Sequence, residues 1–129
     1  MDYFKKGIGL YEEKKYNEAI KILENIKSND DKYLASQYII GVCYMKKSEI
    51  EKENCETFLE RALSYFFKVL KIKKYHYETL YNVSLVYLLL NNLQKAYIYS
   101  NIANSVKDCE QSEFLVNRIT ELVRDVMLE

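Results

Sequence analysis

The sequence predicts an all-α fold, a helical-repeat superhelix of three helix pairs followed by a C-terminal capping helix. Three observations carry this prediction. One phrase, YNEAIKIL at 16–23, returns in looser form as FLERALSYFF at 58–67 and as LQKAYIYS at 93–100. Apolar residues recur in these phrases with the three-and-four spacing of an amphipathic helix. The chain also contains no proline, which is the strongest helix breaker.

The phrases recur with a fixed period. Their central alanines are Ala19, Ala62 and Ala96, which are 43 and 34 residues apart. Gly7 and Ser84 each stand twelve residues before an alanine of the set, and Gly41 lies 34 residues after Gly7. A 34-residue period therefore holds on both sides of the chain's middle, and 43 less 34 places nine inserted residues between Gly41 and its alanine.

Small residues at these positions predict tightly packed helix pairs. Glycine inside a helix costs about 1 kcal/mol relative to alanine, so Gly7 and Gly41 need a compensating contact. A residue without a bulky side chain lets a neighbouring helix approach closely. We therefore expect the second helix of each pair to press against the first at its alanine.

A 34-residue helix-turn-helix unit with these small residues and aromatics resembles the tetratricopeptide repeat (TPR). The matching sites are Tyr3, Gly7, Leu10, Tyr16, Ala19 and Leu23 in the first repeat; Gln37, Ile40, Gly41, Tyr44, Ala62, Phe66 and Val69 in the second; and Leu80, Val83, Ser84, Tyr87, Leu93, Ala96, Ser100 and Ala103 in the third. The chain departs from the family pattern in three ways. No repeat has the closing proline, Gln37 replaces a large apolar residue, and Ile26 and Val69 stand where a small residue is usual.

The resemblance covers nearly the whole chain and divides it into repeats. At 129 residues we expect one domain, 1–129, with repeats at about 1–33, 34–76 and 77–110. The phrase TFLE at 57–60 has the spacing of a capping box, which predicts that the second helix of the middle repeat starts there. The inserted residues are then SEIEKENCE at 48–56. They are expected to form a solvated loop or an extra helical turn, or else a contact for a partner.

The last segment, 111–128, is predicted to be an amphipathic capping helix. Its apolar stripe is Leu115, Ile119, Leu122 and Val126, widened by Phe114, Val123 and Met127. A terminal repeat leaves an apolar face without a neighbour, so a final helix that covers it is expected. Asp108 or Ser112 could cap this helix.

Charge and hydropathy exclude several classes of partner. Lysine plus arginine equals aspartate plus glutamate at 19 each, which disfavours nucleic acid and an anionic membrane as main partners. The longest apolar run, VSLVYLLL at 83–90, is too short to insert across a bilayer. No apolar run follows a basic start at the N-terminus, so a secretory signal is not expected. These features together predict a cytoplasmic protein.

No catalytic, cofactor-binding or metal-binding residues are predicted. Cys43, Cys55 and Cys109 are odd in number and widely spaced, which suits neither a disulfide framework nor a zinc site, so we expect reduced thiols. His76 is the only histidine, and nothing near it in sequence supplies further ligands or a nucleophile. Without a phosphate loop or a nucleophile beside a base, we expect that the protein is not an enzyme.

The resemblance to TPR proteins implies a concave groove lined by the first helix of each repeat. The implied groove residues are Phe4, Ile8, Tyr11, Tyr38, Val42, Met45, Tyr81, Leu85 and Leu88. All of them are aromatic or aliphatic, and some could equally belong to the core. If they are exposed together, the natural ligand is an amphipathic helix or an extended apolar segment.

One branch of the TPR family grips C-terminal carboxylates of chaperones with lysine, asparagine and arginine. The corresponding sites here are Phe4, Ile8, Ile39, Glu78 and Asn82. A carboxylate would lose its water there without gaining a cation. We therefore expect that the protein is not a carboxylate-clamp co-chaperone.

The sequence thus predicts a protein–protein interaction adaptor or scaffold whose partner is another protein or peptide. Two alternatives stay open: a chaperone-like holder of apolar segments, and an RNA-binding helical repeat, which would want a more basic and polar groove. Self-association is also left open.

Overall fold

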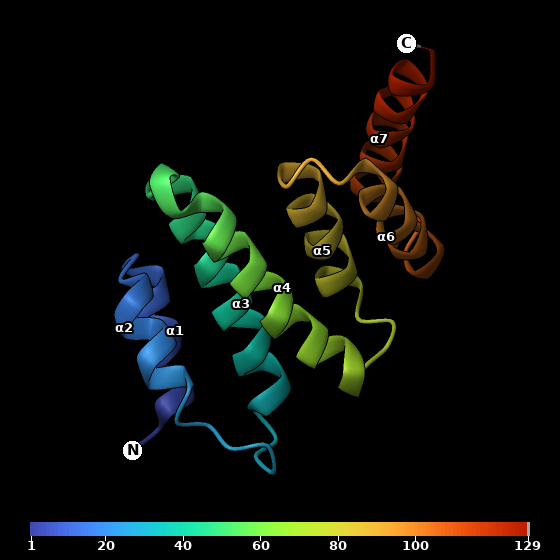
Figure 1. Ribbon diagram of the computed structural model, residues 1–129. Helices are drawn as coiled ribbons and strands as arrows, with labels where there is room; N and C mark the ends of the chain where they lie inside the picture. Colours follow the sequence, from blue (N-terminus) through green and yellow to red (C-terminus); the bar gives the residue numbers. More distant parts are fainter. Residues whose placement is uncertain (129) are drawn as a thin grey trace. The chain divides into compact units, whose positions relative to one another are not determined.

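The computed structural model describes residues 1–128, and every regular element in that range is helical (Figure 1). The helices are α1 (Tyr3–Glu12), α2 (Tyr16–Leu23), α3 (Tyr33–Ile50), the short 3₁₀ helix η1 (Lys52–Asn54), α4 (Cys55–Ile72), α5 (Tyr77–Leu89), α6 (Leu93–Val106) and α7 (Glu110–Leu128). Three pairs, α1–α2, α3–α4 and α5–α6, are followed by the single helix α7. The predicted all-α helical-repeat fold class is confirmed.

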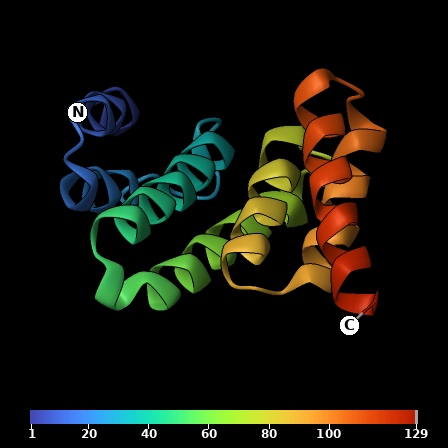
Figure 2. The ribbon, with the colours of Figure 1, turned by 90° about the horizontal axis from the view of Figure 1, so that it is seen from above.

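The helices gather into two compact parts. The N-terminal part is Met1–Ile72, and the C-terminal part begins at Lys73. In the N-terminal part α3 packs against α4 and also contacts both helices of the first pair. In the C-terminal part α6 contacts both α5 and α7, and α7 overlaps α6 in the view of Figure 2. A single domain over 1–129 stays a prediction.

Small residues on the first helix of each pair allow the close approach that the sequence predicted. The atoms nearest to the missing side chain of each glycine belong to a larger residue of the second helix. A Cβ atom at Gly7 would collide with Leu23, and one at Gly41 would lie 2.5 Å from the ring of Phe66. Each of these large residues stands one turn after its alanine and is fully buried. Contact of the alanines themselves with the glycines stays a prediction.

Compared with the other two pairs, the third pair has a larger residue on its first helix and a smaller one on its second helix. Ser84 takes the place of the glycine, and the position one turn after Ala96 is the small residue Ser100 instead of a leucine or phenylalanine. The Ser84 hydroxyl donates a hydrogen bond of 2.9 Å to the carbonyl oxygen of Ala96. The smaller Ser100 on α6 thus leaves room for the Ser84 side chain on α5. The hydrogen bond satisfies the buried Ser84 hydroxyl.

The turn inside a pair uses a left-handed residue at one repeated position. Lys14 has φ 63° and Asn91 has φ 61°, and each stands seven residues after the small residue of its repeat. The equivalent residue of the middle repeat is Ser48, which lies inside α3 and is buried. Its hydroxyl donates to the carbonyl oxygen of Met45 at 2.6 Å. The middle repeat therefore continues as helix where the other two turn.

The inserted residues of the middle repeat add helical turns. α3 runs nine residues past Gly41, whereas α1 ends five residues past Gly7. α4 begins seven residues before Ala62, whereas α2 begins three residues before Ala19. One extra turn on each helix accounts for eight of the nine residues. The extra-turn alternative for 48–56 is the form that the structure adopts.

Two predictions of helix ends and faces were wrong. Thr57 is not an N-cap, because α4 already begins at Cys55. The added turn is held by packing instead, since the Phe58 ring stacks on Tyr44 with centroids 6.2 Å apart. In α7, Leu115 and Ile119 are buried as expected, but three members of the predicted stripe are exposed. These three are Phe114, Val126 and Met127.

The two glycines of α1 provide a matched test of the packing. Alanine at Gly7 must displace the buried Leu23, whereas a Cβ atom at Gly9 has no other atom within 4 Å. Both substitutions gain about 1 kcal/mol of helix propensity, and only the first adds overpacking of about 1 to 3 kcal/mol. We expect Gly7→Ala to be less stable than Gly9→Ala by roughly that amount in urea denaturation. Equal stabilities would contradict this packing.

Candidate functional site

All nine groove residues are half-buried, so none is sealed in the core and none stands free in water. They lie on α1, α3 and α5, the first helices of the three pairs. Six belong to the N-terminal part and three to the C-terminal part. Their role as a binding surface stays a prediction, and each part is described separately.

In the N-terminal part, the groove residues are held by core contacts on one side. The ring of Tyr38 lies 5.9 Å from that of Phe66, which is fully buried. The ring of Tyr11 lies 5.9 Å from that of Tyr16 on α2. Burial raises the pKa of Tyr11, and Cys43 of α3 raises it further. Both aromatic side chains are therefore positioned by packing before any ligand arrives.

The other four groove residues of the N-terminal part are three aliphatic side chains and one aromatic ring, Phe4, which lies beside a lysine. The ammonium of Lys32 lies 5.3 Å from the ring centroid of Phe4, which is a cation–π distance. Ile8 on α1 and Val42 and Met45 on α3 complete the set. The six side chains expose apolar surface with one cation at its edge.

In the C-terminal part, Tyr81 lines a cavity of about 500 Å³ between α5 and the start of α7. Cys109, Glu110, Gln111 and Phe114 form the rest of the wall. The Cys109 sulfur lies 3.5 Å from the Ser112 hydroxyl and 3.4 Å from the Tyr77 hydroxyl. Hydrogen bonds from Ser112 and then Tyr77 lower the pKa of Cys109 to about 7. The sequence did not indicate this environment, because Tyr77 lies on α5 and is brought to Cys109 only by the fold.

The other two cysteines are also free thiols, as expected. Cys43 is buried on α3, and burial raises its pKa to about 12. Cys55 begins α4 and is half-buried.

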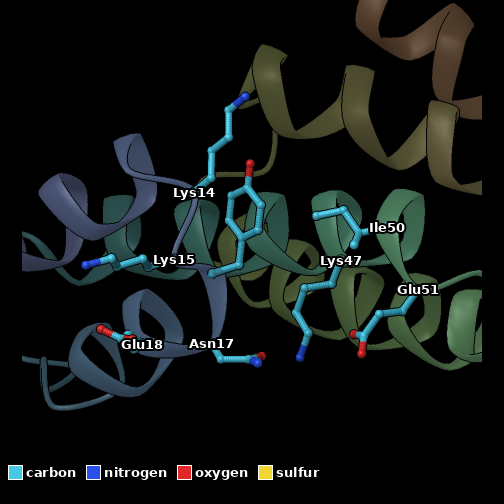
Figure 3. A pocket seen from close by; sticks show the side chains of 8 residues that line it. Lys14, Lys15, Asn17, Glu18, Lys47, Ile50 and Glu51 are labelled. Carbon is cyan, nitrogen blue, oxygen red and sulfur yellow. The ribbon is translucent and has the colours of Figure 1, made fainter.

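A second cavity, of about 330 Å³, was not anticipated (Figure 3). One wall is the turn between α1 and α2 together with the start of α2, from Lys14 to Glu18. The other wall is the end of α3, with Lys47, Ile50 and Glu51. The extra turn of α3 therefore builds one side of it. The only signal in the sequence was the nine-residue insertion, and the charged lining is a solvated surface of mixed sign.

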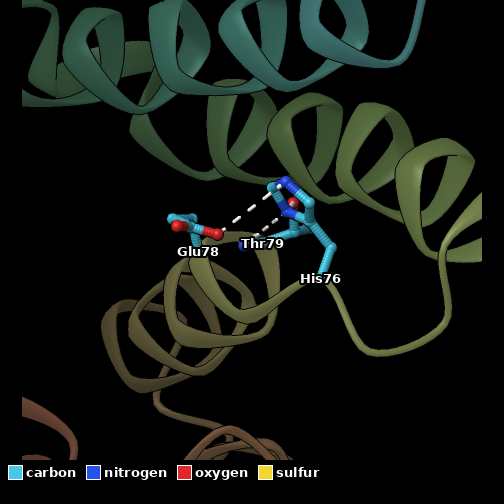
Figure 4. Close-up of polar contacts among 3 residues, drawn as sticks. All are labelled: His76, Glu78 and Thr79. Atoms are coloured by element: carbon cyan, nitrogen blue, oxygen red, sulfur yellow. Dashed lines mark hydrogen bonds and ion pairs between the residues drawn. The ribbon is translucent and has the colours of Figure 1, made fainter. Parts of the chain in front are cut away.

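His76 has a structural role at the start of α5 (Figure 4). Its Nδ1 accepts a hydrogen bond from the Thr79 backbone N–H at 3.3 Å and lies 2.7 Å from the Thr79 hydroxyl. Its Nε2 lies 3.8 Å from Oε2 of Glu78. A backbone N–H can only donate, so Nδ1 carries no proton in this cap. Burial lowers the pKa of His76, and Glu78 opposes that effect.

Residues 1–128 contain neither a metal-binding cluster nor a membrane-spanning helix. No group of three or more His, Cys, Asp or Glu side chains is arranged to hold a metal ion. No helix in that range is both long enough and apolar enough to cross a bilayer.

Comparison with solved structures supports the fold. PcrH in complex with the chaperone binding region of PopD superposes with a TM-score of 0.71, covering 98% of this chain and 89% of that one at 16% identity. PcrH from Pseudomonas aeruginosa gives 0.67, covering 97% and 89% at 17% identity. PcrH in complex with the chaperone binding region of PopB gives 0.64, covering 92% and 90% at 17% identity. At these identities the likeness establishes the fold alone.

Sequence comparison adds no closer relative. No protein-family model matches the chain, and no curated protein is significantly similar to it.

The His76 cap predicts a pH-dependent stability. The folded state lowers its pKa below the ordinary value of 6.5, so the stability is present above that value and is lost as pH falls through the lower folded pKa. Asparagine also caps helices but does not titrate here. Between about pH 7 and about pH 5, we expect the melting temperature of the wild type to fall more than that of His76→Asn. Parallel curves would show that the cap does not depend on neutral imidazole.

Proposed function

We propose that the protein is a TPR-like interaction adaptor that binds an apolar helix or an extended apolar segment of another protein along its first helices. The observation that carries the proposal is that all nine groove residues are half-buried and apolar or aromatic. A core residue would be sealed, and a chance surface residue would be exposed. The six positions of the N-terminal part and the three of the C-terminal part therefore each leave some apolar surface open to a ligand, and ligand sites are mostly apolar.

The energetics favour an apolar ligand. Fully burying a large apolar side chain contributes about 1.5 to 3 kcal/mol, and about a third of that at most remains available at each partly buried groove residue. The aromatic side chains of Tyr11 and Tyr38 already pack against neighbouring rings. A ligand that covers them therefore meets little loss of side-chain freedom. A few such anchors usually carry most of the binding energy.

A chaperone-like holder is the second candidate, and the structural comparison favours it. Two of the similar structures are PcrH bound to chaperone binding regions of PopD and PopB. By analogy, the segment held here would be a region of a larger protein. Adaptor and holder use the same surface and differ in whether the ligand folds elsewhere afterwards.

Other classes receive less support. The carboxylate-clamp sites include Phe4 and Ile8, which are half-buried and apolar, and Glu78, which would repel a carboxylate. The neutral charge balance disfavours nucleic acid as a ligand. We therefore propose a cytoplasmic, non-enzymatic protein without a cofactor.

The proposal is tested with peptides selected from a random displayed library by the whole chain. We expect enriched peptides to carry regularly spaced aliphatic and aromatic residues. Val42→Lys and Met45→Lys should each weaken their binding at least about tenfold, which corresponds to about 1.4 kcal/mol. Fluorescence anisotropy measures the affinity, and circular dichroism checks that each variant keeps its helices.

Two controls accompany this test. Ile72→Lys makes the same kind of change at an exposed apolar residue at the end of α4, outside the groove, and should leave binding unchanged. A peptide ending in Glu-Glu-Val-Asp should show no saturable binding at micromolar concentration. Peptide affinities that survive both groove substitutions, or tight binding of the acidic peptide, would overturn the proposed site.

A further inference from the structure

The C-terminal part carries an apolar face, formed by α6 and α7, that no groove residue belongs to. We call it the α6–α7 face. It comprises Leu93, Tyr97 and Ile98 of α6 and Val123, Val126, Met127 and Leu128 of α7. Two hollows open on it, of about 430 and 330 Å³, and share Tyr97, Val123 and Met127.

The repeat shows that the fold does not require this face to be apolar. The charged cavity of the N-terminal part occupies the corresponding place, between the start of α2 and the end of α3. Tyr16 there and Leu93 here are 77 residues apart, the same separation as Ala19 and Ala96. The N-terminal version is lined by Lys14, Lys15, Glu18, Lys47 and Glu51 among others. The same helix ends therefore tolerate charge in one part and present hydrocarbon in the other.

We propose that the α6–α7 face binds the same face of a second copy of this chain, forming a two-fold symmetric dimer. Five of its residues are substantially exposed: Tyr97 by 42%, Ile98 by 46%, Val126 by 57%, Met127 by 80% and Leu128 by 79%. Their exposed fractions add up to about three whole residues, or roughly 450 Å² of mostly apolar surface at about 150 Å² for each large side chain. One side of a standard interface buries about 800 Å², of which a little over half is apolar. The face therefore supplies the apolar area that one side of such a dimer needs.

The shape of the face suits a copy of itself. Met127 and Leu128 are the most exposed of its residues, and Met127 lines both hollows together with Tyr97 and Val123. A two-fold axis brings the projecting residues of each copy to the hollows of the other. Methionine is flexible enough to fill an irregular hollow. Arg124 lines the second hollow and Asp125 follows it in the sequence, so both signs of charge stand at or beside the face.

The test is the oligomeric state of the whole chain by sedimentation velocity over a range of concentration. We expect the wild type to shift from monomer to dimer as its concentration rises. Met127→Lys should raise the dimer dissociation constant at least about tenfold, and because this side chain is exposed, the fold should be unaffected. Phe114→Lys is the matched control, since Phe114 is a 71% exposed apolar residue of the same helix that lies outside both hollows.

Three outcomes would overturn the proposal. The first is a wild type that stays monomeric at every concentration, which would leave the face to a different protein. The second is a Met127→Lys variant that dimerises as tightly as the wild type, and the third is a Phe114→Lys variant whose dimer is weakened equally. None of these results bears on peptide binding by the groove residues, so the two proposals are tested separately.

Discussion

Close approach of two helices at a small residue is the contact on which the rest of the molecule depends. At Gly7 and Gly41 the missing side chain is replaced by Leu23 and Phe66 of the paired helix. Because each of these large residues is fully buried, the pairing direction of the second helix is set by shape. The same contact holds part of the groove surface, because the Tyr38 ring packs against Phe66 and the Tyr11 ring against Tyr16 of the paired helix.

The repeated pairing also explains where the molecule varies. The turn after the first helix depends on one left-handed residue, Lys14 or Asn91, and the middle repeat abandons it without disturbing the glycine contact below. The added turns are satisfied locally, by the Ser48 hydroxyl and by the stacking of Phe58 on Tyr44. Lengthening a pair at its end is therefore compatible with the fold, and it creates a charged cavity that a standard repeat would lack.

The sequence predicted the helix pairs because the twelve-residue spacing of Gly7 and Ala19 recurs at Ser84 and Ala96, although most other residues differ. It could not predict that Leu23 fills the glycine's space, since that depends on how two helices rotate against each other. The Thr57 capping pattern is local, and packing of the added turn overrode it. Amphipathic spacing in α7 indicates which residues share an apolar stripe but not whether a neighbouring helix covers them. Met127 was therefore predicted to lie on the covered face, whereas it is exposed.

The most direct test of the central claim, that the groove residues contact the ligand, is methyl NMR of the labelled chain with a peptide selected by it. Cross-saturation from the peptide identifies methyl groups in contact without changing any residue. The account predicts transfer to Ile8, Val42 and Leu85, which lie on the first helices. Transfer confined to Ile98, Val123 and Val126 would contradict it, because the ligand would then lie on the α6–α7 face.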